Sequence, residues 1–285
     1  MQKYEIVNAL VARYGYLNYL EICTPITGHR FSRIDRRSLQ CCHRLMYRCT
    51  PDFQDGLEVT YRNESEHIGR MPDAATPYDI IFVDPFHTFE CSIRDLHLAF
   101  ETVRPGGTIV VHDCCPAKKE MCQPTFQPGG WCGVTYRAYI EFVLCQQDLA
   151  YYTVDTDYGC GVIKKGNAHQ ADPETRRKLW ELWSLRKLND PEMFEFFVQH
   201  RRELLSLISV RDFLARENAS WLPLLRLAEW RDRFAAFCAR SSTDSVRRAG
   251  FQSESGLKQE GRPSPEKIRV PRWCKVHSSR PVARV

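Results

Sequence analysis

The chain has 285 residues, of which 43% are hydrophobic, and its formal net charge is +5. This length and composition predict a globular protein with a sizeable core, built as one large domain or as a domain with an extension. The charge does not indicate a nucleic-acid partner, because residues 241–285 hold ten Lys or Arg against four Asp or Glu, and the other residues carry a net charge of about −1.

The sequence carries no recognisable signal for membrane insertion or secretion. No apolar run approaches the roughly 18 to 20 residues that a membrane-spanning helix needs. The opening residues, MQKYEIVNALVARYGY, lack the basic-then-apolar order of a signal peptide. The 13 cysteines are odd in number and several lie inside apolar patterns, so we expect reduced thiols and a cytoplasmic protein.

Strands and helices alternate along the first 165 residues. The expected strands, each a short and mostly apolar run, are 17–23, 44–49, 57–62, 79–84, 107–113, 149–157 and 158–165. Apolar residues at helical spacing predict helices at 89–104 and 131–146. This alternation predicts an open α/β sheet with parallel strands, and the short turn between the last two strands predicts that these two are antiparallel.

The composition changes twice after this region, which divides the chain into three expected segments. Residues 1–168 form the α/β domain. Residues 169–240 show helical spacing in runs such as PEMFEFFVQHRRELL, and we expect a helical extension there. Residues 241–285 are rich in Ser, Arg, Gly and Pro and poor in apolar residues, which predicts a disordered basic tail.

Polar side chains stand at the ends of three predicted strands. Glu21 lies near the end of the first strand, His112 and Asp113 end a later one, and the stretch YDIIFVDPFHTFE places Asp84 at a strand end with His87 three residues on. A single carboxylate in such a place is commonly a turn or cap residue. Ligands bind beyond the carboxyl ends of parallel strands, however, and neighbouring strands are about 4.8 Å apart. We therefore expect these side chains to converge on one site.

The motifs LEICTPITG, VDPFHTFECSIRDLHLAF, RPGGTIVVHDCCP and GGWCGVTYRAYIEF resemble the class I S-adenosylmethionine-dependent methyltransferases. Within them, the chain is most similar to the group with a D-x-x-H-[TS]-[YF] strand end followed by P-G-G-x-[IVL]-x-x-H-D-C. The resemblance covers roughly residues 14–165. It implies a Rossmann-like sheet of order 3-2-1-4-5-7-6, in which strand 7 is antiparallel.

The resemblance also implies a cofactor-binding loop after the first strand. The family's E-x-G-x-G-x-G pattern uses glycines so that the backbone can approach the cofactor. Here Cys23 stands where the first glycine is expected. The residues that the resemblance assigns to S-adenosylmethionine binding are Glu21, Cys23, Thr24, Gly28 and Asp84.

Catalytic and metal-binding roles follow from the same resemblance. Asp84 is expected over the cofactor, and His87 and His112 are candidate general bases, because an imidazole of ordinary pKa accepts a proton near neutral pH. Related enzymes hold Mg²⁺ at the ends of the corresponding strands, which here points to Asp84, His112 and Asp113. An imidazole in that set favours Mn²⁺, Fe²⁺ or Zn²⁺ over Mg²⁺.

These residues predict an O-methyltransferase acting on a small hydroxylated, saccharide-like acceptor. Three alternatives stay open at this point. The altered glycine loop fits a protein of the same fold that has lost transfer and acts as a binding or scaffolding partner. VDPFH is similar to the D-P-P-Y strand end of amino-directed methyltransferases, although the second proline and the tyrosine are missing. A metal-dependent enzyme of other chemistry, such as a hydroxylase, is the third, because fold does not determine chemistry.

Overall fold

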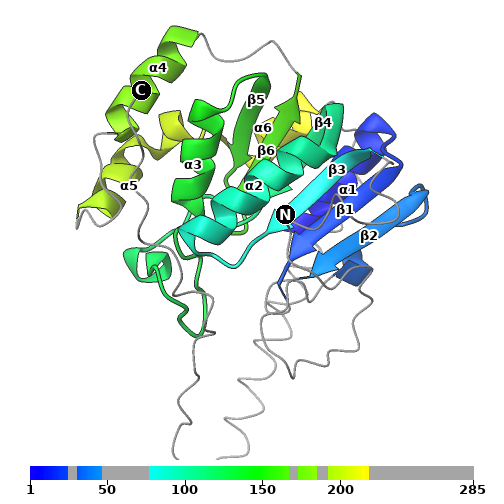
Figure 1. Cartoon of the computed structure of the whole chain (residues 1–285), viewed down its shortest axis with the longest axis horizontal. Helices are drawn as coiled ribbons and strands as arrows, with labels where there is room; N and C mark the ends of the chain where they lie inside the picture. Colours follow the sequence, from blue (N-terminus) through cyan, green and yellow to red (C-terminus); the bar gives the residue numbers. More distant parts are fainter. Residues whose placement is uncertain (25–30, 47–76, 167–172, 185–191, 218–285) are drawn as a thin grey trace, which may run out of the picture. The chain divides into compact units, whose positions relative to one another are not determined.

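A seven-stranded sheet forms the centre of the computed structural model, which describes residues 1–24, 31–46, 77–166, 173–184 and 192–217 (Figure 1). In spatial order the strands are β2 (Cys41–Met46), β1 (Asn18–Cys23), β3 (Tyr78–Asp84), β4 (Val103–Val111), β6 (Cys160–Lys165), β5 (Leu149–Val154) and β7 (Leu207–Ile208). The described residues fall within one compact unit, Met1–Ser220.

The strand directions agree with the expected sheet. β1 runs parallel to β2 and β3, β3 runs parallel to β4, and β6 is antiparallel to both β4 and β5. This is the class I order without its third strand, because the strand expected at 57–62 lies outside the described residues. β7 was not expected: it pairs parallel with β5 from within a segment whose pattern indicated only helix. The second strand also begins earlier than expected, at Cys41.

The helices and short 3-10 turns of the described residues are α1 (Lys3–Tyr14), η1 (Phe31–Arg33), α2 (Phe89–Thr102), η3 (Lys119–Cys122), α3 (Thr135–Cys145), α4 (Pro173–Ser184), α5 (Met193–Leu204) and α6 (Val210–Arg216). The helices expected at 89–104 and 131–146 are confirmed as α2 and α3, with shorter ends. The sequence analysis missed α1. Its signals are a capping box between Gln2 and Glu5 and a left-handed Gly15 at its end, with φ of 62°.

Alternation along β3 divides the core between the two faces of the sheet. Ile81 and Val83 belong to the cluster that includes Leu96 of α2, whereas Phe82 contacts Tyr4 of α1 with ring centroids 5.4 Å apart. Figure 1 shows α2 and α3 on one face, with α1 behind the sheet. The domain boundaries expected at 168 and 240 stay predictions, and the tail 241–285 lies outside the described residues.

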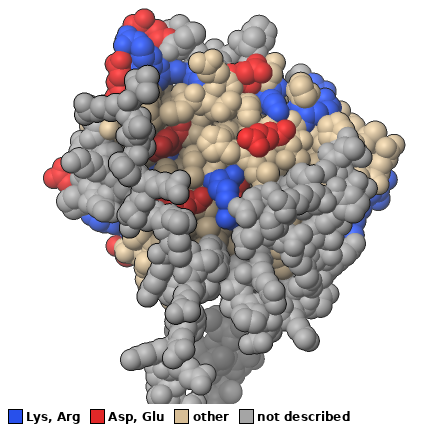
Figure 2. All heavy atoms as spheres, viewed as in Figure 1, with Lys and Arg blue, Asp and Glu red and all other residues tan. Residues whose placement is uncertain are grey.

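The face of the protein seen in Figure 2 carries charged side chains of both signs. On the face seen in Figure 2, the described Lys and Arg side chains stand among Asp and Glu side chains with neutral surface between them. Among the described helices, none combines the length and the apolar character that crossing a membrane requires. The ten described cysteines are all free thiols. The expected lack of a nucleic-acid partner stays a prediction.

Close packing of α3 on the sheet yields a stability prediction. A Cβ atom added at Gly161 of β6 would lie 2.5 Å from the Tyr139 ring of α3, which is fully buried. We expect Gly161→Ala to destabilise the protein by about 1–3 kcal/mol through overpacking, measured by urea unfolding. Gly130→Ala is the control, because the atom it adds would meet only ordinary contacts, at 3.4 Å or more. Equal stability of the two variants would contradict this packing.

Candidate functional site

The carboxyl ends of β1, β3 and β4 meet where the strand order reverses. Cys23 pairs with Asp84, and Val83 pairs with Val111, so the residues that follow these strands leave the sheet side by side. The His112 amide donates to the carbonyl oxygen of Val83 at 3.0 Å and extends this alignment by one residue. The topology therefore gathers the polar strand ends at the switch point, where open α/β sheets bind ligands.

A cavity of about 610 Å³ opens at this edge. Its wall combines a polar part with aromatic rings and includes Lys3, Thr24, Asp84, Phe86, His87, His112, Asp113, Phe126, Trp131 and Tyr158. Five of them were predicted from the sequence. The volume and the lining of this cavity are typical of a small-molecule site.

Two carboxylates and two imidazoles form a buried cluster at the polar wall. His87 Nε2 lies 3.0 Å from Asp113 Oδ2 and 3.5 Å from Asp84 Oδ1. His112 Nδ1 lies at the same two distances from the same two oxygens. Acid and imidazole thus alternate around the cluster, and one oxygen of each carboxylate, Asp84 Oδ1 and Asp113 Oδ2, faces both rings. Of the side chains that the sequence predicts to converge, the structure brings these four together, and their roles stay predictions.

The loop before α3 holds His87 in position. His87 Nδ1 donates to the carbonyl oxygen of Trp131 at 2.8 Å, which turns Nε2 toward the carboxylates. Gly133, at φ of 56°, passes so close to His87 that an added Cβ would lie 2.1 Å from its carbonyl oxygen. Only glycine fits this close approach in a left-handed conformation. The orientation of His87 therefore depends on a loop more than 40 residues away in the sequence.

Asp113 reaches the cluster through an uncommon backbone conformation. Its φ of 60° lies in the left-handed region, which Asp tolerates better than most residues. The next amide, that of Cys114, donates to the carbonyl oxygen of Gly159 at 3.0 Å and fixes the turn. Such strained positions are concentrated at functional sites. His112 and Asp113 can thus turn both side chains to the same side of the strand end, which an extended chain would not allow.

The cluster shifts the protonation of its members. Burial alone would lower the pKa of His87, but the carboxylates of Asp113 and Asp84 outweigh it and raise that pKa to about 9. The pKa of His112 is raised as well, against the effect of its burial, chiefly by Asp113. The pKa of Asp84 is held low against its burial, chiefly by Lys3 and His112. At neutral pH both rings are therefore donors, and the predicted general-base role requires that one first lose its proton.

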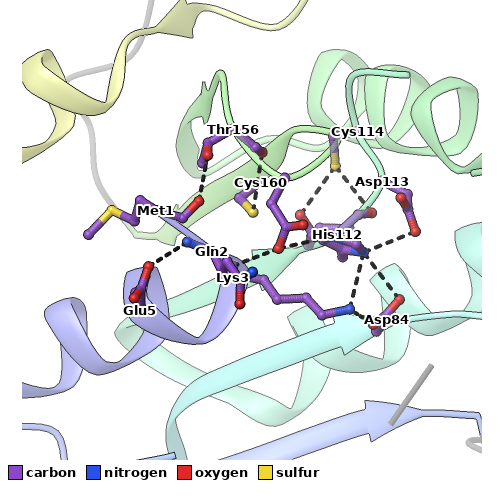
Figure 3. Close-up of polar contacts among 12 residues, drawn as sticks. Met1, Gln2, Lys3, Glu5, Asp84, His112, Asp113, Cys114, Thr156 and Cys160 are labelled. Carbon is purple, nitrogen blue, oxygen red and sulfur yellow. Dashed lines mark hydrogen bonds and ion pairs between the residues drawn. The ribbon is translucent and has the colours of Figure 1, made fainter. Parts of the chain in front are cut away.

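Lys3 is a charged site residue that sequence reasoning missed. Figure 3 shows its side chain extending from the first turn of α1 to Asp84 at the end of β3, beside His112. Lys3 Nζ lies 2.6 Å from Asp84 Oδ2 and 3.4 Å from His112 Nδ1. No motif marks this lysine among the 40 Lys and Arg of the chain, and only the packing of α1 brings it here.

Two of the residues predicted for cofactor binding lie away from the cavity wall. The Glu21 side chain is fully buried, lies 3.3 Å from Arg44 Nε, and accepts a hydrogen bond from the Tyr19 hydroxyl at 2.9 Å. Cys23 is also fully buried, and its main chain pairs with Asp84. Thr24 does line the cavity. Gly28 lies outside the described residues, as does most of the loop that would carry the cofactor.

The structure adds His87 to the residues that could hold a metal ion. Ligand atoms of Asp84, His87 and Asp113 lie within 4.8 Å of one another, and all three residues are buried. His112 falls instead into a second group, with Asp157 and Cys160. His87 therefore joins Asp84 and Asp113 as a candidate ligand, and His112, whose Nδ1 faces the same two oxygens, stays a predicted one.

A family model matches part of the chain. The model of a methyltransferase domain matches residues 27–114, a range that contains β2, β3, α2 and β4 and the residues Asp84, His87, His112 and Asp113. A search of curated proteins found no match to the chain.

Several solved structures have a partly similar backbone. The O-methyltransferase TomG of Streptomyces achromogenes, solved with S-adenosylmethionine, is 16% identical over 57% of this chain and 79% of its own, with a TM-score of 0.42. An O-methyltransferase of Bacillus cereus, in complex with the demethylated cofactor, is 16% identical over 56% and 78%, with a TM-score of 0.40. The methyltransferase PaMTH1 of Podospora anserina, bound to the same product, is 10% identical over 56% and 77%, with a TM-score of 0.41. Likenesses this distant add nothing to the family match.

The residues matched by the family model and the order of the strands both indicate the same fold. The match ends at Cys114, directly after the buried cluster, and the described strands follow the class I order on both sides of the switch point. The family match, on a sheet of this order, confirms the resemblance that the sequence motifs indicated, and residues 27–114 are identified as part of a methyltransferase domain.

Proposed function

We propose that this protein is an S-adenosylmethionine-dependent methyltransferase that methylates a hydroxyl group of a small, saccharide-like acceptor. The observation that carries the proposal is the buried cluster of Asp84, His87, His112 and Asp113, which lies inside the matched methyltransferase segment and lines a cavity of about 610 Å³. The protein would act in the cytoplasm, as its free thiols suggest.

The proposed reaction is an in-line displacement. The acceptor oxygen forms a bond to the methyl carbon, the bond from that carbon to sulfur breaks, and its electron pair stays on sulfur to give S-adenosylhomocysteine. The acceptor hydroxyl gives its proton to a base. The protein accelerates such a step mainly by holding donor and acceptor in line and by receiving that proton.

The cluster residues then have distinct roles. Asp84, at the end of β3, faces the cavity beside Thr24 and positions the reacting groups. The Trp131 carbonyl holds His87 with Nε2 toward the two carboxylates. Once the His87 imidazole is neutral, it takes the proton from the hydroxyl of the acceptor. His112 faces the same carboxylates from the neighbouring strand end and is the second candidate for that role.

The cavity wall supports an acceptor with one flat apolar side and one hydroxyl-bearing edge. Trp131 lies with its ring centroid 5.4 Å from that of Phe86 and 5.3 Å from that of Phe126. These three rings form an apolar part of the cavity wall, and the Trp131 ring centroid lies 5.0 Å from that of His87 in the polar cluster. A sugar ring presents such a pair of surfaces, and so does a hydroxylated ring of another kind, so acceptor profiling decides between them.

Cofactor binding is the first prediction. S-adenosylhomocysteine at about 100 times its Kd should raise the melting temperature by about 5–10 °C, because a ligand that binds only the folded protein stabilises it. Methionine alone is the control. If S-adenosylhomocysteine causes no shift at millimolar concentration, the scaffolding alternative is favoured.

Loss of the Asp84 charge tests the reactive cluster. Asp84→Asn keeps the side-chain volume but removes the charge, so labelled methyl transfer from S-adenosylmethionine into hydroxylated compounds of a cell extract should fall at least about 10²-fold. Mass spectrometry measures the product. Asp212→Asn, at an exposed position of α6, should transfer at the wild-type rate. An Asp84→Asn protein with wild-type transfer would exclude the site.

The raised pKa of His87 predicts a pH-dependent stability. A histidine whose folded pKa is about 9 and whose ordinary value is 6.5 stabilises the fold fully below pH 6.5 and loses this effect as the pH rises through 9. Between these pH values the urea midpoint should therefore fall more for the wild type than for His87→Gln. His97→Gln, at an exposed position of α2, should behave like the wild type. If the urea midpoints of the wild type and His87→Gln fall equally as the pH rises, the raised pKa of His87 is refuted.

A further inference from the structure

The carboxylate of Asp84 needs a cation beside it. Its side chain is 1% exposed, and an ionised carboxylate so deeply buried is costly unless it is paired. Oδ1 of Asp84 faces the two imidazoles, and Oδ2 points to the Lys3 ammonium at 2.6 Å. The lysine is therefore the direct charge partner on the second oxygen.

Hydrogen bonds of the backbone at the beginning of α1 fix the position from which the Lys3 side chain extends. The Lys3 amide donates to Asp157 Oδ2 at 2.9 Å, and the Thr156 hydroxyl donates to the carbonyl oxygen of Met1 at 2.5 Å (Figure 3). The capping bond from the Gln2 amide to Glu5 Oε2, at 2.7 Å, fixes the same turn of α1. With its side chain only 16% exposed, Lys3 is a built part of the cavity wall.

A divalent metal fits poorly beside this lysine. The predicted ligands were Asp84, His112 and Asp113, and Lys3 Nζ lies within 3.4 Å of atoms of the first two. A metal ion bound at about 2.1 Å from Asp84 would lie only a few ångströms from the ammonium. Two cations so close in a buried site repel each other strongly. The lysine and the metal therefore exclude each other at Asp84.

We infer that the Lys3 ammonium is the resident cation of this site and that it competes with a divalent metal for Asp84. Lys3 is in this sense a positioning residue: it holds Asp84 Oδ2 and leaves Oδ1 toward His87 and His112. The inference goes beyond the proposed function, because it concerns cation binding by the protein alone.

Metal binding by the purified full chain tests the inference without cofactor or acceptor. Mn²⁺ is titrated into the chelator-treated wild type and into Lys3→Met, and electron paramagnetic resonance reports the free ion. We expect the variant to bind one Mn²⁺ about tenfold or more tightly than the wild type, because the competing charge is gone. Lys178→Met, which removes an exposed lysine 3.1 Å from Glu174, should match the wild type.

Equal Mn²⁺ affinity of wild type and Lys3→Met, including no binding to either, would overturn the inference. Circular dichroism and melting temperature verify that the variant is folded, and Lys3→Gln is the second variant. Should neither fold, the wild type decides: stoichiometric Mn²⁺ binding that Asp84→Asn abolishes overturns the inference, and an unchanged free-ion signal supports it. None of these readouts requires methyl transfer, so a failed transfer assay would bear on the proposed function alone.

Discussion

Two buried carboxylates at the ends of adjacent strands are the constraint on which the rest of the site depends. Asp84 and Asp113 are nearly inaccessible to water, so their charge has to be balanced inside the protein. The cluster does this with side chains from three separate parts of the chain: Lys3 before the sheet begins, His87 at the start of α2, and His112 after β4. Removing any of these partners leaves a buried charge less well compensated.

The scaffold around the cluster serves to hold these partners in place. Gly133 lets the loop before α3 pass against His87, and the Trp131 carbonyl in that loop turns the imidazole. The turn between β5 and β6 holds Met1 and Lys3, at the beginning of α1, through Thr156 and Asp157. Because the same contacts also shape the cavity, the stability of the fold and the geometry of the site are coupled.

The cavity brings two chemically different surfaces together. The carboxylates and imidazoles lie at the strand ends, where class I sheets bind their ligands. The aromatic wall comes from the residues after β3 and from the loop before α3, with Phe86 and Trp131 as its centre. A reaction that needs both a positioned acceptor and a proton acceptor suits this pairing, and the lysine at the rim of the polar wall sets which cations the site can hold.

The sequence by itself determined the described strands other than β7 and the convergence of Asp84, His87, His112 and Asp113, while the order of the strands was implied by the family resemblance. It could do so because buried strands leave continuous apolar runs and because parallel strands end at one edge. Only the tertiary structure decided that Lys3 joins the site, that Glu21 pairs with Arg44, and that the Trp131 carbonyl orients His87. These depend on how α1 packs, on a buried ion pair between neighbouring strands, and on a loop 44 residues beyond His87. Local sequence patterns do not predict contacts between residues so far apart in the chain.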